Sequence, residues 1–285
     1  MKSGAKKKYI LLAAASLGVF VLLAIALAAS ESVRRAERDS AAQLSALYSA
    51  PTPAAAASAG VTGDAPQIDD SGDAWELPPR FSELYAINPE FIGWLRAGGV
   101  IDEPVVFRDN SFYLSHALDQ TQSHSGTVFA DVENSAWYSD DYVILYGHNI
   151  HGGDRFSRLS SYKDADFVRE NPIIEWDTIR SGDAPRQYAV FAAFDASMLP
   201  DDDNYFHLRR FDELRAGGAE AMQALIDEVT ARSCIDIPLA VAPGDDILAL
   251  VTCSYSNADG RLMVFARALR ADESAAAVAR VISGG

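Results

Sequence analysis

Short apolar runs rich in β-branched and aromatic residues, separated by polar turns, restrict the fold of this chain more than any other feature. Runs of about four to eight such residues are typical of strands, and many of them at close spacing predict a closed barrel or a sandwich. The runs are 104–107, 126–132, 142–146, 173–176, 187–194, 247–252 and 262–269. The region after residue 75 is therefore predicted to be mainly β.

Four segments have helical features. Pro79–Leu84 is expected to form one or two helical turns, and Asn88-Pro89-Glu90 to start a short helix that Gly93 ends, because proline is favoured at the first helical position. Lys163–Glu170 and Ala219–Arg232 are predicted as two further helices. In the longer one, apolar residues recur at helical spacing, at Ala221, Met222, Leu225, Ile226 and Val229. That stripe predicts a helix with one face packed on the barrel.

An uncharged apolar run from Tyr9 to Ser30 follows four lysines within residues 1–8. About 20 apolar residues cross a bilayer as a helix, and a basic flank keeps its side cytoplasmic. We therefore predict a cytoplasmic flank (1–8), a single membrane anchor (9–30) and an extracellular remainder. A cleaved signal peptide is the alternative, because Ala26-Leu27-Ala28 fits a cleavage site, but the run exceeds the usual apolar length of about 7–15 residues for such a peptide. In both interpretations the rest of the chain lies outside the cell membrane.

Residues 31–75 are predicted to be a stalk and a flexible linker. Charged, helix-forming residues continue the helical pattern to Ser49, and two prolines then end it. Residues 50–72 are mainly Ala, Pro, Ser, Gly and Asp, a composition that cannot bury a core. The folded domain is accordingly placed at residues 76–272, followed by a C-terminal tail at 273–285.

The net charge of −16 is concentrated in the predicted domain, because residues 76–285 hold 17 Lys/Arg against 33 Asp/Glu. Nucleic-acid binding depends on basic residues that neutralise phosphates, so this class of partner is excluded. Such acidity is typical of a protein that stays soluble outside a cell. The acidic residues are scattered in a way typical of a solvated surface, and neither a metal site nor a cofactor is predicted.

Two candidate reactive groups lie on either side of the turn of the last predicted hairpin. Cys253 ends the run 247–252, a polar link from Ser254 to Gly260 turns the chain, and Arg261 begins the next run. In this interpretation a thiol and a guanidinium at adjacent strand ends face one cleft. The alternative is a buried cysteine that packs as a small hydrophobic residue, beside an ordinary surface arginine.

A second cysteine, Cys234, raises the alternative of a disulfide, since disulfides persist outside the cell. A Cys234–Cys253 disulfide would occupy the candidate nucleophile. However, Cys234 follows a predicted helix while Cys253 ends a predicted strand, and nothing in the sequence brings the two together.

A reactive thiol needs a base, and His148 is the leading candidate among five histidines. It follows the run 142–146 in Tyr146-Gly147-His148-Asn149, so it also lies at a strand end, where Gly147 permits a close backbone approach or an unusual turn. His151, in a glycine-rich loop, is the second candidate. The others lie among polar loop residues and are expected to be solvent-exposed: His116, His124 and His207.

These motifs, in this order and spacing, resemble those of the class B sortases. The matching segments are Leu250–Cys253 with Arg261 downstream, Tyr146–Asn149, Ile87–Leu95 and Asp109–Leu114. The likeness extends almost continuously from residue 80 to residue 270. It implies a closed eight-stranded sortase-type β-barrel with N-terminal helices and one longer helix before the cysteine-bearing strand, tethered to the membrane of a Gram-positive cell.

The resemblance also implies a cysteine transpeptidase. Cys253 would attack the carbonyl of a threonine in a sorting signal, His148 would act as general acid and base, and Arg261 would stabilise the oxyanion. The substrate would be a surface protein or a pilin. The acceptor would be an amine, either of a lipid-linked peptidoglycan precursor or of a pilin lysine, which leaves cell-wall anchoring and pilus assembly both open.

Contacts to the sorting signal are implied for five residues: Asn110, Leu114, Tyr146, Tyr205 and Phe206. Core packing is an equally good interpretation for Leu114 and Tyr146. Two positions depart from the family pattern, because Ala249 replaces the threonine that commonly begins the cysteine motif and Ser254 replaces an acidic residue found in some relatives. The second departure leaves the acceptor-amine site open.

Rival classes account for fewer of these features. Papain-like proteases place the cysteine before the histidine, the reverse of the order here, and an L,D-transpeptidase would carry a Ser-His-Gly-Cys type of motif, which is absent. The remaining alternative is a non-catalytic exported β-domain, an adhesin or a pilus-associated protein, held by a Cys234–Cys253 disulfide.

Overall fold

The computed structural model describes residues 2–49, 67–68, 74–134, 139–149, 156–253 and 259–284. The chain divides after Gln43 into two units, the first of which is most of helix α1 (Lys2–Ser49). The part of α1 from Ser16 onward has a mean hydropathy of 2.0 over its most apolar stretch, which is long enough to cross a membrane. A signal sequence has the same properties, so the structure establishes one N-terminal apolar helix that suits either role.

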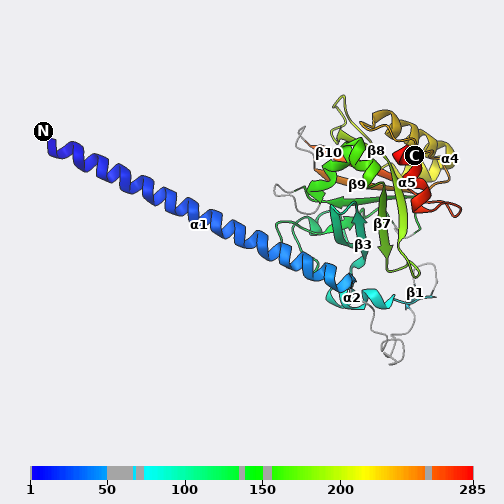
Figure 1. The fold of residues 1–285 in the computed structure, drawn as a ribbon, viewed down its shortest axis with the longest axis horizontal. Helices are drawn as coiled ribbons and strands as arrows, with labels where there is room; N and C mark the ends of the chain where they lie inside the picture. The colour runs from blue at the N-terminus through cyan, green and yellow to red at the C-terminus, as the bar shows by residue number, and fades with distance from the viewer. Residues whose placement is uncertain are drawn as a thin grey trace. The chain divides into compact units, whose positions relative to one another are not determined.

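The second unit is built on a closed barrel of eight strands (Figure 1). Their order around the barrel is β10-β8-β7-β3-β4-β5-β6-β9. The strands are β3 (Phe91–Ala97), β4 (Ile101–Val106), β5 (Val128–Ala130), β6 (Tyr142–Gly147), β7 (Ile173–Thr178), β8 (Arg186–Ser197), β9 (Ile247–Cys253) and β10 (Gly260–Ala268). β4 pairs with β5 and β6 with β9 in parallel, and the other pairs are antiparallel. The predicted closed, eight-stranded barrel is confirmed.

Short elements precede or connect the barrel strands, and two longer helices pack on the barrel. The short elements are the strands β1 (Gln67–Ile68) and β2 (Ala74–Trp75), the 3-10 helices η1 (Pro79–Phe81), η2 (Phe112–Leu114) and η3 (Phe156–Lys163), and the helices α2 (Ser82–Ile87) and α3 (Ala165–Glu170). α4 (Phe211–Arg232) precedes the cysteine-bearing strand and is kinked at Gly218, where φ is 54°. α5 (Ala275–Ser283) follows β10 and is capped by Ser274, whose side chain accepts a hydrogen bond from the N–H of Ala277.

The expectation of a short helix from Asn88 to Gly93 is wrong, because the chain enters β3 at Phe91. Every residue of β3 except Arg96 is buried, so both faces of the strand are covered and its sequence lacks the alternation that identifies a strand. A Cβ at Gly93 would lie 2.3 Å from the carbonyl oxygen of Asp177 in β7. Gly93 therefore permits close strand pairing and does not end a helix.

Alternate residues of β9 pack in two different apolar cores. Leu250 packs in one core with Trp94 of β3, whereas its neighbours Ala249 and Val251 pack in a second core beneath α4. α4 contributes five buried residues to that second core: Phe211, Met222, Leu225, Ile226 and Val229. The prediction that this helix packs one face on the barrel is confirmed.

Two segments placed outside the predicted domain also pack on the barrel. Tyr48, near the end of α1, stacks on Trp94 with ring centroids 4.9 Å apart, and its hydroxyl donates a hydrogen bond to buried Asp177 at 3.0 Å. In the segment expected to be a tail, α5 buries Val278 and Ile282. The folded unit therefore includes the end of α1 and all of α5.

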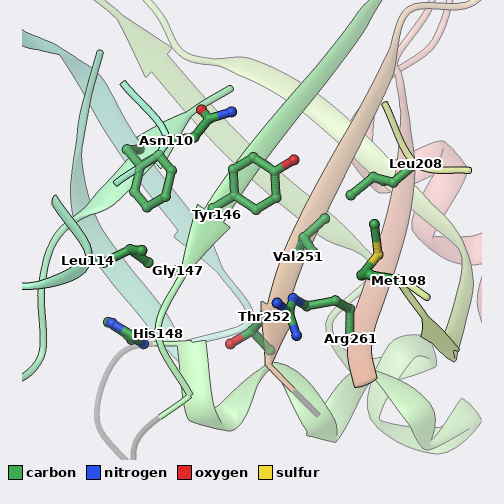
Figure 2. A pocket seen from close by; sticks show the side chains of 11 residues that line it. Asn110, Leu114, Tyr146, Gly147, His148, Met198, Leu208, Val251, Thr252 and Arg261 are labelled. Atoms are coloured by element: carbon green, nitrogen blue, oxygen red, sulfur yellow. The ribbon is translucent and has the colours of Figure 1, made fainter. Parts of the chain in front are cut away.

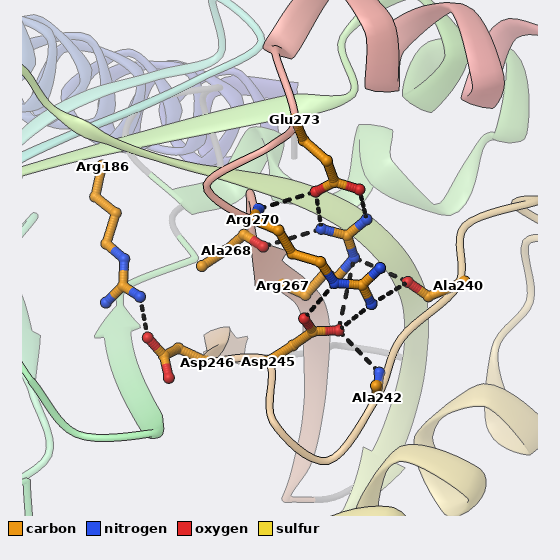
Figure 3. A network of polar contacts seen from close by, with 9 residues as sticks. All are labelled: Arg186, Ala240, Ala242, Asp245, Asp246, Arg267, Ala268, Arg270 and Glu273. Carbon is orange, nitrogen blue, oxygen red and sulfur yellow. Dashed lines mark hydrogen bonds and ion pairs between the residues drawn. The ribbon is translucent and has the colours of Figure 1, made fainter.

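A network of ion pairs joins the chain before β9, the end of β10 and the turn before α5 (Figure 3). The Arg267 side chain is 1% exposed, and its guanidinium donates hydrogen bonds to both carboxylate oxygens of Glu273, at 2.6 and 2.7 Å. Asp245 accepts two hydrogen bonds from Arg270, each at 2.8 Å. The hydrogen bonds from Arg267 lower the pKa of Glu273 to about 2. A buried guanidinium is thus neutralised by one main partner.

Replacing Glu273 by alanine is expected to lower the free energy of unfolding by about 3 kcal/mol at neutral pH, because it leaves a buried charge without its main partner. The folded-state pKa of Glu273 is depressed from its ordinary 4.5 to about 2, so its contribution is present above pH 4.5 and is lost as the pH falls through that interval. Urea unfolding should show that the difference in free energy of unfolding between wild type and Glu273→Ala becomes smaller as the pH falls from about 5 to about 3.

The matched control is Glu220→Ala, at an exposed position on α4, which should change the free energy of unfolding by less than about 0.5 kcal/mol at either pH. A gap between wild type and Glu273→Ala that stays constant with pH would contradict the role assigned to the Arg267–Glu273 pair.

Candidate active site

Backbone pairing brings the ends of three strands together. β6 and β9 run in parallel with Gly147 opposite Thr252, so the next residues along the two strands are His148 and Cys253. β10 runs antiparallel to β9, and Arg261, its second residue, is the direct partner of Cys253. Neighbouring strands lie about 4.8 Å apart. The structure therefore places the backbones of the three predicted catalytic residues at adjacent strand positions, although His148 is distant in the sequence.

A pocket of about 290 Å³ opens at this junction (Figure 2). Its lining consists of Asn110, Leu114, Phe129, Tyr146, Gly147, His148, Met198, Leu208, Val251, Thr252 and Arg261. His148 and Arg261 lie at one end of the pocket, and the side-chain amide of Asn110 and the hydroxyl of Tyr146 lie at the other. Apolar side chains from several elements line the wall between the two polar ends. Such a pocket suits an extended ligand whose reacting group lies beside His148 and Arg261.

The walls of the pocket come from three parts of the chain. The strands β5, β6, β9 and β10 contribute lining residues, among which Val251 belongs to the second core and Tyr146 packs against it. η2 and the loop before it supply one wall, and the segment between β8 and α4 supplies the opposite wall with Met198 and Leu208. The pocket is therefore framed by the rigid barrel and by two connecting segments, which is where specificity commonly resides.

Gly147 is required by a close approach to the ring of Phe156. A Cβ at position 147 would lie 2.4 Å from Cγ of Phe156, whose side chain is fully buried in η3. Only glycine lets β6 pass this ring and remain paired with β9 at the position before His148. The sequence expectation of a close backbone approach at Gly147 agrees with this geometry.

Arg261 contributes a positive charge to the pocket. Its side chain is partly buried, and one terminal nitrogen donates a hydrogen bond to the carbonyl oxygen of Gly260 at 2.9 Å. Within the described part of the chain, its guanidinium makes no ion pair with a carboxylate. Arg261 therefore places a guanidinium with several N–H donors in the lining of the pocket.

The two cysteines have different settings. Cys253 is the last residue of β9, and its side chain, like residues 254–258 of the polar link, lies outside what the structure describes. Cys234 has a free, exposed thiol, so the alternative of a Cys234–Cys253 disulfide is wrong. Partial desolvation raises the pKa of the Cys234 thiol above its ordinary value, which makes Cys234 a weak nucleophile at neutral pH.

Three of the five residues expected to contact a sorting signal line the pocket: Asn110, Leu114 and Tyr146. Phe206 is fully buried in the second core, and the carbonyl of Tyr205 accepts a hydrogen bond from Arg232 at 2.7 Å. Neither of these two residues lines the pocket. The segment between β8 and α4 presents Met198 and Leu208 to it instead.

Two other histidines, His116 and His207, have partners outside the pocket. His116 stacks on Phe112 with ring centroids 3.9 Å apart and hydrogen-bonds its carbonyl oxygen at 2.7 Å through Nδ1. His207 lies 2.9 Å from a carboxylate oxygen of Glu213. The second-ranked candidate base, His151, lies outside the described residues.

Several pocket residues were not identified from the sequence. Phe129 and Val251 lie within strands, where apolar residues indicate core packing, and Met198 and Leu208 lie in a connecting segment without a motif. The only available signal was the position of Val251 and Thr252 directly before Cys253. Their role as lining depends on strand pairing and could not be obtained from local patterns.

Comparison with known proteins finds relatives that are sortase B proteins. No family model matches the chain. The sortase B of Listeria monocytogenes is 27% identical over 193 residues, which cover 66% of this chain and 74% of the relative. The sortase B of Staphylococcus aureus is 28% identical over 196 residues, which cover 67% and 75%. The structure of an S. aureus sortase B–substrate complex matches with a TM-score of 0.62 at 22% identity, over 85% of this chain and all of that one (100%).

Gly147→Ala is expected to lower the free energy of unfolding by about 1–3 kcal/mol, because the added methyl group overlaps the buried ring of Phe156. It should also shift the NMR signals of the His148 imidazole, since the strand end must move. Urea unfolding and histidine NMR measure the two effects.

Gly244→Ala is the matched control, because nothing lies within 4 Å of a Cβ at that exposed turn position. If both variants unfold at the same urea concentration, Gly147 has no packing role.

Proposed function

We propose that this chain, which is a homologue of sortase B and a sortase-type cysteine transpeptidase, cleaves a sorting signal after a threonine and joins the released protein to an amine. The observation that carries the proposal is the strand register that makes His148, Cys253 and Arg261 neighbours beside one pocket. The related S. aureus structure is a substrate complex, which supports the assignment of a substrate to this fold.

In the first half-reaction, the thiolate of Cys253 attacks the carbonyl carbon of the threonine. A C–S bond forms and the carbonyl oxygen becomes an oxyanion. The C–N bond of the scissile peptide then breaks while protonated His148 gives its proton to the leaving amine. The products are a thioester on Cys253 and the free downstream peptide.

The second half-reaction reverses these roles with a different amine. Neutral His148 takes a proton from the incoming amine, whose nitrogen attacks the thioester carbonyl. The new C–N bond forms, the C–S bond breaks, and the sulfur leaves as a thiolate. Both catalytic groups return to their starting protonation states, so the cycle is balanced by the two substrates alone.

Arg261 stabilises the oxyanion in both half-reactions. Its backbone is paired with Cys253, and its guanidinium lines the pocket, so fixed positive charge and N–H donors lie close to where the carbonyl oxygen develops its charge. Such preorganised donors act without reorganisation of the site at the moment of reaction. The planar guanidinium also orients the peptide through more than one N–H group.

The N-terminal helix supports the proposed location, and the homology to sortase B supports an amine as the acceptor. We assign residues 9–30 as a single-pass anchor, with residues 1–8 in the cytoplasm and the barrel outside the cell. The acceptor is the amine of a cell-wall precursor or of a pilin lysine, in an anchoring or a pilus-assembling role. The excess of Asp/Glu over Lys/Arg in residues 76–285 favours approach of a cationic amine.

The proposed function is tested with the full chain in detergent micelles, peptides of the type Asn-Pro-x-Thr, and either triglycine or a lysine-containing peptide. Mass spectrometry should detect cleavage after the threonine and a new amide to the added amine. Cys253→Ala should abolish both products, and Cys234→Ala should retain them. Cleavage at another bond, or products from Cys253→Ala, would overturn the proposal.

Arg261→Ala is expected to lower kcat by about 100- to 1000-fold, because it removes the charge that stabilises the oxyanion. Arg261→Lys should retain part of the activity, because it keeps the charge but loses the planar fork of donors. Steady-state kinetics on the cleaved peptide measure both effects.

The control for charge is Arg215→Ala, whose side chain is 55% exposed, and kcat should stay near the wild-type value in this variant. The free energy of unfolding of Arg261→Ala should fall by less than about 1 kcal/mol. An equal loss of kcat in both arginine variants would remove the catalytic role assigned to Arg261.

A further inference from the structure

Asp131 is a fully buried carboxylate directly behind one end of the pocket. Its Oδ2 accepts hydrogen bonds from Nε of Arg209 at 2.8 Å, from the hydroxyl of Tyr146 at 2.8 Å and from the amide of Asn110 at 3.2 Å. Its Oδ1 accepts from the other nitrogen of the Arg209 fork at 3.2 Å and from the N–H of Glu133 at 2.8 Å. Five donors therefore converge on one carboxylate, which satisfies a charge that would be costly to bury alone.

Arg209 ties together the two sides of the pocket. It directly follows Leu208, a lining residue from the segment between β8 and α4, whereas Asp131 directly follows β5 on the barrel. The carbonyl of Leu208 also accepts a hydrogen bond from the hydroxyl of Tyr142 at 3.1 Å. The Arg209–Asp131 ion pair thus holds the wall that carries Leu208 against the strand end that carries Asp131.

The hydrogen bonds to Asp131 determine what Tyr146 and Asn110 offer to a ligand. Tyr146 donates its only hydroxyl proton to Asp131, so its oxygen can only accept. The Asn110 carbonyl oxygen accepts from the N–H of Val132 at 2.9 Å, and one amide hydrogen goes to Asp131, which leaves one amide N–H. Burial, together with the charge of Asp131, raises the pKa of Tyr146, so the hydroxyl keeps its proton at physiological pH.

We propose that Asp131 and Arg209 are a positioning pair that sets the hydrogen-bonding polarity of the pocket end formed by Asn110 and Tyr146. Neither residue lines the pocket, and both act through the side chains that do. With the pair intact, this end presents one acceptor, the Tyr146 oxygen, and one donor, the Asn110 amide. The inference rests on the proposed function, because it assigns a peptide substrate to the pocket.

One acceptor beside one donor is complementary to a group that both donates and accepts, such as a primary carboxamide. A carboxylate of the same shape can accept from Asn110 but cannot donate to Tyr146. Two lone pairs would then face each other, close to the charge of Asp131. The pair therefore discriminates between a carboxamide and a carboxylate, and the discrimination depends on the proton of Tyr146 pointing at Asp131.

The test uses two peptides of the type Asn-Pro-x-Thr that differ only in whether the first residue is asparagine or aspartate. In Asp131→Asn, the new amide can donate to the Tyr146 oxygen, which frees the hydroxyl to donate into the pocket. The ratio of kcat/KM values, asparagine peptide over aspartate peptide, should fall at least about tenfold. KM for the asparagine peptide should rise while kcat changes by less than about threefold, since the reacting end is untouched.

Measuring the Kd values of the two peptides tests this inference separately from the proposed function. In the Cys253→Ala background, which has no nucleophile, the ratio of the two Kd values should fall in the same way when Asp131→Asn is added. Tyr146→Phe removes the acceptor and keeps the ring, so adding Asp131→Asn to it should change the ratio by less than about twofold. Failure of the wild type to cleave either peptide would defeat the proposed function, whereas the Kd ratio would still decide the inference.

Matched controls distinguish positioning from charge and from folding. Arg209→Ala should lower the preference for the asparagine peptide over the aspartate peptide. Arg215→Ala removes the same charge nearby and should leave this preference unchanged. Asp212→Asn, at a side chain that is 97% exposed, is the matched control for Asp131→Asn. Circular dichroism and urea unfolding establish which variants are folded. Folded Asp131→Asn and Arg209→Ala proteins with the wild-type Kd ratio, or a Cys253→Ala protein that binds neither peptide, would overturn the inference.

Discussion

Parallel pairing of β6 with β9 is the constraint on which the whole site depends. The histidine and the cysteine come from strands that are distant in the sequence, and only their shared register, with Gly147 opposite Thr252, makes His148 and Cys253 neighbours. A hairpin alone would bring Arg261 to Cys253 but would leave the thiol without a base. Barrel closure around β6, β9 and β10 therefore brings together the strand ends that carry the proposed reactive residues.

The register of β9 is held along its whole length. A slip of one residue would interchange the residues that enter the two cores, Leu250 on one side and Val251 on the other, at a large cost in buried apolar surface. The network around Arg267 fixes the opposite end of the β9–β10 pair, where Arg267 is partnered with Ile247. Asp131 fixes the pocket wall in a comparable way, because a buried carboxylate accepts only donors that reach it. The site thus inherits its geometry from interactions that are mostly structural.

Much of the candidate site was accessible from the sequence because its proposed reactive residues are chemically distinctive and lie at the ends of apolar runs. Cys253, His148 and Arg261 were identified in this way, and the resemblance to class B sortases supplied their roles and the eighth strand. β3 was misread because both its faces are buried. Phe206 is a core residue and Leu208 a lining residue although both lie in one short segment, a difference that depends on tertiary packing. Asp131 and Arg209 carry no local signal, since their meeting is a long-range contact.

Cys253 is the proposed nucleophile, and the chain contains its own control in Cys234, which is free and exposed. The most direct measurement is mass spectrometric mapping of the acyl adduct formed when the full chain in micelles is incubated with an Asn-Pro-x-Thr peptide and no amine. We expect a hydroxylamine-sensitive adduct, ending in threonine, on the fragment that contains Cys253, with the Cys234 fragment unmodified. An adduct on Cys234, or an adduct that persists in Cys253→Ala, would contradict this assignment.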